Sequence, residues 1–264
     1  MTAPQLGPLV LVAASLFIVV DAATSALLGL GVARGLVVAA CRTVVQLLLV
    51  GLVLGTVFAS RSPFLIGGVL LAMFATASYE VLSRQEHRFA GLWRYGLGTT
   101  TTLMATTLVG TFALVVLRPR PWYEPQVLIP LTGIVLGSVM NGVSISLNAF
   151  NGGLVRERAA IEAQLALGAT RYAALKPLQR SALKSGLIPI VNQMSAAGII
   201  TLPGMMTGQI LAGMPPFDAA KYQILVLFLL GGATALGAIA TTMLAVRRAT
   251  DARDRLRLDR LEPG

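Results

Sequence analysis

The amino-acid sequence predicts an all-α integral membrane protein with about seven transmembrane helices. Hydrophobic residues make up 55% of the 264 residues and charged residues 12%, about half the charged share of a typical soluble domain. The hydrophobic residues occur in long runs separated by short charged segments, as in helical spans and unlike the alternating pattern of barrel strands. The mean hydropathy of +0.77 agrees with this class.

Each predicted span has close to the roughly 20 apolar residues that a helix needs to cross a bilayer. The runs cover residues 6–30, 36–58, 63–83, 95–117, 126–149, 185–212 and 218–246. The first run has no basic residue before it, and it is longer than the apolar core of a cleaved signal peptide. We therefore expect the first run to be retained as a span.

The basic residues orient these spans. With the N-terminus outside, 16 of the 21 Lys and Arg residues fall in inside segments and 4 in outside segments, while Arg42 lies within a span. An excess of basic residues in short loops marks the cytoplasmic side. We therefore expect an N-out, C-in, multi-pass protein of the cell inner (plasma) membrane. The net charge of +10 has the same explanation and does not indicate nucleic-acid binding.

The chain divides into a transmembrane domain, residues 1–246, and a charged cytoplasmic tail, residues 247–264. The longest polar stretch of the domain, residues 151–184, is predicted to form a cytoplasmic loop of two helices. Asn151-Gly152-Gly153 is expected to end the preceding span, and Gly168-Ala169-Thr170 to separate the two helices, with Thr170 as an N-cap. The tail mixes both charge signs, which favours a solvated helical extension.

Several classes of chemistry are absent from the sequence. No G-x-x-x-x-G-K-[ST] loop occurs, so a P-loop nucleotide site is not expected. His87 is the one histidine, and no nucleophile lies at a spacing that suggests a base beside it. Cys41 lies in an apolar run and is interpreted as a small packing residue. We expect no enzyme activity and no cofactor bound by this chain.

The first half of the cytoplasmic loop resembles the docking helix of ABC importer permeases, which binds a groove on a separate ATPase subunit. Glu162-Ala163 followed by Leu167-Gly168 matches its acidic start and glycine turn. Docking in a groove needs apolar anchors at helical spacing. The alternative is an ordinary amphipathic interfacial loop. The residues expected to couple the chain to an ATPase are Glu157, Ile161, Glu162, Ala163, Leu165, Leu167, Gly168, Ala169 and Thr170.

Pro203-Gly204 and Gly208 interrupt the predicted sixth span. Broken backbone inside a membrane is tolerated only where protein or a water-filled cavity covers it, and discontinuous helices often form substrate sites in transporters. The thioethers of Met205 and Met206 favour soft metals such as Cu(I), or they are flexible packing groups at a kink. We expect a hinge or a transport site here.

Polar residues within the apolar runs mark helix contacts or a transport path. Arg42 either pairs with Asp21 on the neighbouring span or extends to the inner surface. Glu80 is expected at an interface. The residues expected along the path or hinge are Arg42, Gln46, Asn141, Asn192, Pro203, Gly204, Met205, Met206, Gly208 and Gln209. The candidate metal ligands are Met205, Met206, Glu124 and Asp218.

Five sequence elements occur in one order between about residues 36 and 246. They are Arg42-x3-Gln46, Ile129-Pro130-x2-Gly133, Leu167-Gly168-Ala169-Thr170, Leu202-Pro203-Gly204-Met205-Met206-Thr207-Gly208 and Tyr222-Gln223. This order resembles the Fet-type iron-export ABC transporter permeases, which are similar to the plant aluminium-tolerance permeases.

The resemblance implies the permease subunit of an exporter of iron or another metal. It implies a separate ABC ATPase subunit, which would hold ATP and Mg, and two copies of each subunit. Relatives in plants leave a nucleotide-sugar exporter open. From the residues alone, an ion-coupled secondary transporter using Asp21, Arg42 or Glu80, or a non-transporting scaffold, also stays open. In the leading hypothesis, ATP binding moves residues 157–176 and the sixth span turns at Pro203-Gly204.

Overall fold

A computed structural model describes residues 7–60, 62–91, 93–119 and 121–263. Arg61 and Arg120, which were counted in the predicted outside loops, lie outside these ranges. The chain forms two compact units, residues 1–62 and residues 63–264.

The first unit consists of two apolar helices, α1 (Pro8–Leu27) and α2 (Ala33–Ser60). Most of their large apolar side chains are exposed, as expected of helices that face lipid. Asp21 lies on α1 and Arg42 on α2, and the predicted contact between them stays a prediction.

The turn between α1 and α2 contains Gly29 with φ of 64° and Gly31 with φ of 74°. Both angles lie in the left-handed region, which glycine adopts without the strain that a side chain would introduce.

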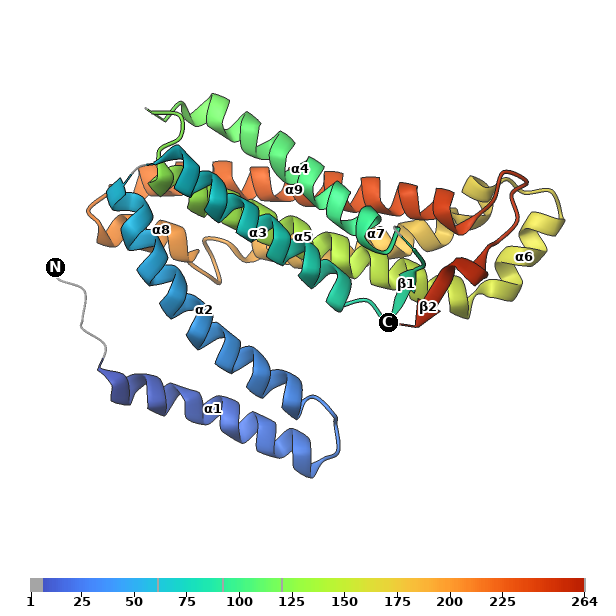
Figure 1. Ribbon diagram of the computed structural model, residues 1–264, viewed down its shortest axis with the longest axis horizontal. Helices are drawn as coiled ribbons and strands as arrows, with labels where there is room; N and C mark the ends of the chain where they lie inside the picture. The colour runs from blue at the N-terminus through green and yellow to red at the C-terminus, as the bar shows by residue number, and fades with distance from the viewer. Residues whose placement is uncertain (1–6, 61, 92, 120, 264) are drawn as a thin grey trace. The chain divides into compact units, whose positions relative to one another are not determined.

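The second unit is a helical bundle built around α5 (Figure 1). Its helices are α3 (Pro63–Ser83), α4 (Trp93–Leu117), α5 (Pro125–Arg156), α6 (Arg158–Ala166), α7 (Arg171–Ala196), α8 (Gly204–Leu211) and α9 (Pro216–Ala249). Helix α5 packs against α3, α4, α7 and α9, and α8 packs against α9. The central place of α5 explains why buried residues occur along its whole length.

Small and hydroxyl-bearing residues bring the helices of the bundle together. Ser138 on α5 and Thr234 on α9 share a hydrogen bond of 2.9 Å between their hydroxyl oxygens, and Thr101 on α4 bonds Thr241 on α9. Gln179 on α7 donates to the Thr242 hydroxyl at 3.4 Å. Small residues let membrane helices approach closely, and such hydrogen bonds then hold them.

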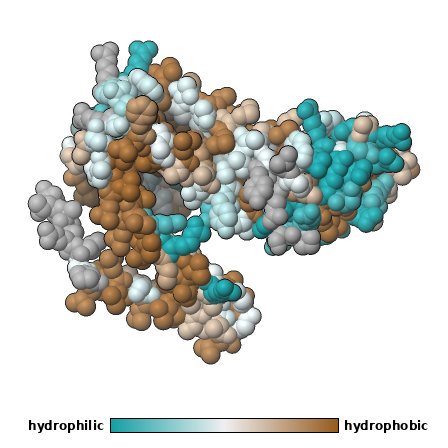
Figure 2. Space-filling view, in the orientation of Figure 1, coloured by the Kyte–Doolittle hydropathy of each residue, from teal (hydrophilic) through white to brown (hydrophobic). Residues whose placement is uncertain are grey.

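Two apolar clusters form the core of the second unit. The first joins α4, α5, α7 and α9 and includes Val135, Val139 and Val143. The second includes Phe150, Leu154 and Leu175, and Ile161 of α6 also belongs to it. We call the end of the unit formed by α6, the first turns of α7, the last turns of α5 and residues 250–263 the base. Figure 2 shows hydrophilic residues gathered at the end of the molecule that holds α6.

Six of the described helices are long and apolar enough to cross a membrane: α1, α2, α3, α4, α5 and α9. The predicted sixth span, residues 185–212, is not one helix. It is divided among the second half of α7, an irregular segment at residues 197–203, and α8. Gly198 has φ of 86°, and Pro203 is the N-cap of α8, so helical geometry is interrupted between them. The orientation of the helices stays a prediction.

Two further expectations were wrong. Helix α5 does not end at Asn151-Gly152-Gly153 but continues to Arg156, because Asn151 is buried and Gly153 lies against Leu178 of α7, where an added Cβ would overlap the Leu178 side chain. The tail is not a solvated helical extension. Its last residues form β2 (Leu261–Pro263), which pairs in antiparallel fashion with β1 (His87–Phe89).

The tail folds back because it carries apolar residues that the base can bury. Leu256, Leu258 and Leu261 pack against the second apolar cluster. Burying such side chains is favourable by about 25 cal/mol for each Å² of apolar surface removed from water. Arg260 donates to the carbonyl of Arg248 at 2.9 Å, near the end of α9. The tail therefore has an apolar face in addition to its charged residues.

Candidate functional site

Helices α5 and α7 cross at two glycines, Gly142 and Gly186. A Cβ added to Gly186 would overlap both the Ser146 hydroxyl and the Gly142 carbonyl, and one added to Gly142 would overlap the Thr234 side chain. Both positions are buried. The two backbones therefore approach as closely as the absence of side chains allows.

A cavity of about 250 Å³ lies beside this crossing. It is lined by residues of α5, α7 and α9: Gly133, Ile134, Gly137, Ser138, Asn141, Gly142, Gly186, Pro189, Ile190, Gln193, Leu230 and Thr234. The structure thus brings the predicted path residue Asn141 together with Gln193. A mostly apolar cavity with a few polar groups is the usual form of a small-molecule site.

Asn141 connects the cavity wall to a charged pair at the end of α3. Arg84 donates a hydrogen bond from Nη1 to the Asn141 Oδ1 atom at 3.0 Å. The Nε atom of the same guanidinium lies 3.4 Å from an oxygen of Glu80, whose side chain is mostly buried. Glu80, Arg84 and Asn141 therefore form a continuous polar chain that ends at the cavity.

Two further asparagines of α5 bind the segment that follows α3. The Asn148 Oδ1 atom accepts a hydrogen bond from the backbone N–H of Glu86 at 3.0 Å. Asn151 donates from Nδ2 to the His87 carbonyl at 2.9 Å. This asparagine face of α5 thus holds residues 84–87 in place.

The predicted coupling residues of α6 divide into an inner and an outer set. Ile161 is 4% exposed and belongs to the second apolar cluster, and Leu165 packs partly against it. Leu167, in contrast, is 89% exposed. Ile161 therefore holds α6 to its own bundle, and Leu167 is the apolar side chain available to a partner.

The charged residues of this loop form local ion pairs. Arg158 lies 2.9 Å from Glu162 one turn along the helix, and Arg156 lies 3.3 Å from Glu157. Exposed pairs of this kind contribute only about 0–1 kcal/mol. Ala163, which follows Glu162, is exposed. These groups make α6 polar on the side that faces away from the bundle.

A tight turn joins α6 to α7 as the sequence predicted. Gly168 has φ of 91°, a conformation that side chains rarely adopt. Thr170 is the N-cap of α7, and its hydroxyl accepts a hydrogen bond from the backbone N–H of Ala173 at 3.3 Å. Ala169, half-buried, lies between them. Both the break between the helices and the cap are therefore confirmed.

The tail binds the first turn of α7. Arg171 forms an ion pair with Asp254, and Arg247 of α9 donates to the Tyr172 hydroxyl at 3.2 Å. These contacts hold the start of α7 to residues far away in the sequence.

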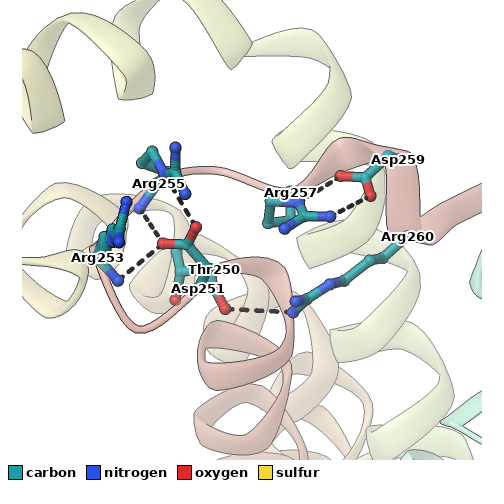
Figure 3. Close-up of polar contacts among 7 residues, drawn as sticks. All are labelled: Thr250, Asp251, Arg253, Arg255, Arg257, Asp259 and Arg260. Atoms are coloured by element: carbon teal, nitrogen blue, oxygen red, sulfur yellow. Dashed lines mark hydrogen bonds and ion pairs between the residues drawn. The ribbon is translucent and has the colours of Figure 1, made fainter.

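Figure 3 shows how the tail keeps its own shape. Asp251 accepts hydrogen bonds from the backbone N–H groups of Arg255 and Arg253, both at 2.9 Å, and these bonds lower the pKa of its carboxyl group. Arg257 binds both oxygens of Asp259 at 2.8 Å. This paired contact lowers the pKa of Asp259 from 3.8 to about 2. The tail is therefore an ordered turn followed by a strand.

The broken segment after α7 is open on its surface. Ile199, Ile200 and Leu202 are exposed, and every residue of α8 keeps part of its surface accessible. Met205 packs partly against the first apolar cluster. Met206 and Gln209 are half-buried, and Gly204 and Gly208 are exposed. The break at Pro203-Gly204 is confirmed, and its role as a hinge stays a prediction.

The other predicted site residues do not lie on the cavity wall. Arg42 and Gln46 belong to α2 in the first unit, and Asn192 is exposed on α7. Asp218 forms an ion pair with Lys221 at 3.1 Å. Glu124 is the N-cap residue of α5. Within the described ranges, no three His, Cys, Asp or Glu side chains gather where they would hold a metal ion.

Sequence reasoning missed three residues of this site: Arg84, Gly142 and Gly186. Arg84 is one of the 16 basic residues assigned to the inside segments, and nothing in the sequence indicates which helix it meets. Gly142 lies four residues from both Ser138 and Ser146, so this spacing of small residues along α5 was the available signal. Gly186 lies between Lys184 and Pro189 and has no such pattern around it.

The chain is similar to several known proteins. It is 38% identical to the UPF0014 membrane protein slr1647 of Synechocystis over 224 aligned residues. The alignment covers 83% of this chain and 85% of that protein. It is 29% identical to the probable iron export permease protein FetB of Escherichia coli, over 84% of this chain and 83% of that protein.

A plant protein is also similar. Identity is 32% to the protein ALUMINUM SENSITIVE 3 of Arabidopsis thaliana, over 77% of this chain and 72% of that protein. No solved structure matches the chain. The family model of UPF0014, an uncharacterised protein family, matches residues 8–250. With six helices able to span a membrane, the chain is a multi-pass membrane protein, and it belongs to the UPF0014 family.

Proposed function

We propose that the chain is the permease subunit of an ABC exporter, driven by a separate ATPase subunit that binds ATP and Mg. Family membership and the name of the Escherichia coli relative support a permease. Iron or another metal is proposed as the cargo on the basis of that name. The working assembly in this proposal contains two permeases and two ATPases.

The observation that carries the proposal is the path of α7. This helix starts at the Thr170 cap beside α6 and ends at Ala196, next to the broken segment. At 1.5 Å per residue it extends roughly 39 Å. It also supplies Gly186 to the crossing and Pro189, Ile190 and Gln193 to the cavity. One helix thus connects the coupling loop, the cavity and the break.

The Gly142–Gly186 crossing gives α7 a point about which to turn. Where no side chains interlock, one helix can rotate against another with little repacking, whereas interdigitated cores resist such movement. In the proposed cycle, an ATPase displaces α6, and α7 moves with it. The cavity beside the crossing then changes shape, and residues 197–203 absorb the movement.

Leu167 is the proposed anchor for the ATPase. Its side chain is 89% exposed, while Ile161 is occupied within the bundle. Apolar anchors that fill a partner's pocket commonly dominate the binding free energy of an interface. We therefore expect Leu167 to matter more for docking than the ion-paired residues Glu157 and Glu162.

The test is purification of the full-length chain from its native membrane in mild detergent, followed by identification of co-purifying proteins. A stoichiometric P-loop ATPase is expected. Leu167→Ala should weaken its retention by at least about tenfold, as loss of an interface anchor does. Leu211→Ala is the matched control, because Leu211 is also exposed, at 71%, but lies on α8. Retention in this control should be unchanged.

Two results would contradict the proposal. The first is purification of the chain alone, with transport that follows a proton gradient and not ATP, which would indicate an ion-coupled secondary transporter. The second is equal loss of the ATPase in both leucine variants, which would show that α6 is not part of the docking surface. Transport assays with iron salts then test the cargo separately from the energy source.

A further inference from the structure

We propose that the cavity beside the Gly142–Gly186 crossing binds a small oxygen-rich anion, a carboxylate or phosphate, either alone or as the ligand of a metal ion. Arg84 and Asn141 set this preference. The inference deepens the proposed function and rests on it, since it takes the cavity as part of the transport path.

The contact with Arg84 determines how the Asn141 amide is turned. A guanidinium group only donates hydrogen bonds, so the amide atom that meets Arg84 Nη1 at 3.0 Å must be the oxygen. The amide oxygen of Asn141 is therefore engaged. The remaining polar group of this side chain is its NH₂, which carries two donors and no acceptor. Asn141 thus offers the cavity donors, which suit an anion's oxygens.

The charge beside the cavity also favours an anion. The guanidinium of Arg84 lies between Glu80, 3.4 Å from its Nε atom, and Asn141, 3.0 Å from its Nη1 atom. The cation is therefore the charge nearer to the cavity wall. The pair thus presents its positive member to the residue that lines the cavity, which favours an anion there over a bare cation.

The remaining lining is consistent with this assignment. Ser138 and Thr234 bond each other, and Gln193 adds a neutral amide. Among the described residues that line the cavity there is no Asp, Glu, His, Cys or Met. Hard cations prefer carboxylate oxygens and soft cations prefer sulfur, so these walls lack the usual ligands of both. A metal ion here would bring its own oxygen ligands.

The experiment measures binding to the full-length chain in nanodiscs of zwitterionic phosphatidylcholine. The probes are radiolabelled citrate, inorganic phosphate, iron(III) citrate and iron(II) alone. We expect saturable binding of citrate or phosphate, with or without iron, and none of iron(II) alone. Asn141→Asp, which is nearly isosteric, should weaken anion binding by at least about tenfold because it replaces the donors with an acceptor.

Variants of Arg84 supply a second comparison. Arg84→Gln should weaken anion binding to a similar degree, and Arg84→Lys should restore part of it by restoring the charge. Arg156→Gln, which removes an exposed arginine at the base, is the control and should bind as the natural chain does. Thermal unfolding of each variant separates a loss of the site from a loss of the fold.

Three outcomes would overturn the assignment. The first is that no anion binds. The second is that iron(II) binds alone and that Asn141→Asp leaves this binding unchanged or strengthens it. The third is that citrate binding is lost when phosphatidylglycerol replaces phosphatidylcholine. The last would identify a lipid headgroup as the occupant. The assay needs no ATPase. If the chain binds the anion but no ATPase partner is found, the anion site is supported and the proposed function is contradicted.

Discussion

The two ends of α7 differ in how firmly they are held. At the base, Leu175 and Leu178 are buried, Thr170 caps the helix, and Arg171 is paired with the tail. At the other end, residues 191–195 are exposed, and the chain then leaves the helix at Ala197. The Gly142–Gly186 crossing lies between these ends.

Under the proposed function, this difference predicts which end of α7 transmits movement and which end changes its backbone conformation. Elements with many buried apolar contacts open rarely, whereas those with few such contacts open at low cost in free energy. In the proposed cycle, the base is therefore expected to move as one piece. A change of backbone angles is expected to require the least free energy in the exposed segment at residues 197–203. Three variants test this comparison.

The largest effect is expected from Gly186→Ala at the crossing. The added methyl group would meet the Ser146 hydroxyl and the Gly142 carbonyl, and the latter belongs to backbone that cannot rotate away. Overpacking of this kind costs about 1–3 kcal/mol. Thermal unfolding in detergent should show this loss. Gly152→Ala, at a helical glycine of α5 with open space around it, should be neutral or stabilising. Equal stability of the two variants would contradict a tight crossing.

A smaller effect is expected from Thr170→Ala at the base. Removing the N-cap hydroxyl costs about 0.5–2 kcal/mol and should raise hydrogen exchange in the first turn of α7. Thr201→Ala is the matched control in the broken segment, where the hydroxyl makes only a 3.5 Å contact with the Ala196 carbonyl. That control should change stability by less than about 0.5 kcal/mol. The reverse order would mean that the base is not the firmly held end.

The smallest effect on stability is expected from the double change Pro203→Ala and Gly204→Ala. Gly204 has open space around it, so stability should change by less than about 1 kcal/mol. Transport should nevertheless be lost, with ATPase retention unchanged, because alanine permits the helix that Pro203 and Gly204 interrupt. Transport at the level of the natural chain would show that this break is not the hinge.

Local signals predicted the helices and their ends well. The run at residues 63–83 coincides with α3, and α2, α4 and α9 extend only a few residues beyond their predicted runs. Thr170 and Gly168 were identified as cap and turn because their roles depend on nearby residues alone. Pro203-Gly204 was identified as a break for the same reason.

Expectations that depended on distant residues failed more often. Asn151-Gly152-Gly153 has the composition of a helix end, yet it lies inside α5, because His87 and Leu178 occupy its two sides. The tail has the composition of a solvated helix, yet β1 and the second apolar cluster bind it. In both cases tertiary contacts outweighed a weak local preference.

The sequence alone determined the class of this protein, most of its helices, and the break after α7, because hydropathy, glycine and proline act over a few residues. Tertiary structure decided the crossing at Gly142 and Gly186, the pairing of Arg84 with Asn141, and the cavity between α5, α7 and α9. These features join residues as far apart in the sequence as Gly133 and Thr234. Which helix faces meet is set by packing of the whole bundle, and no local pattern encodes it.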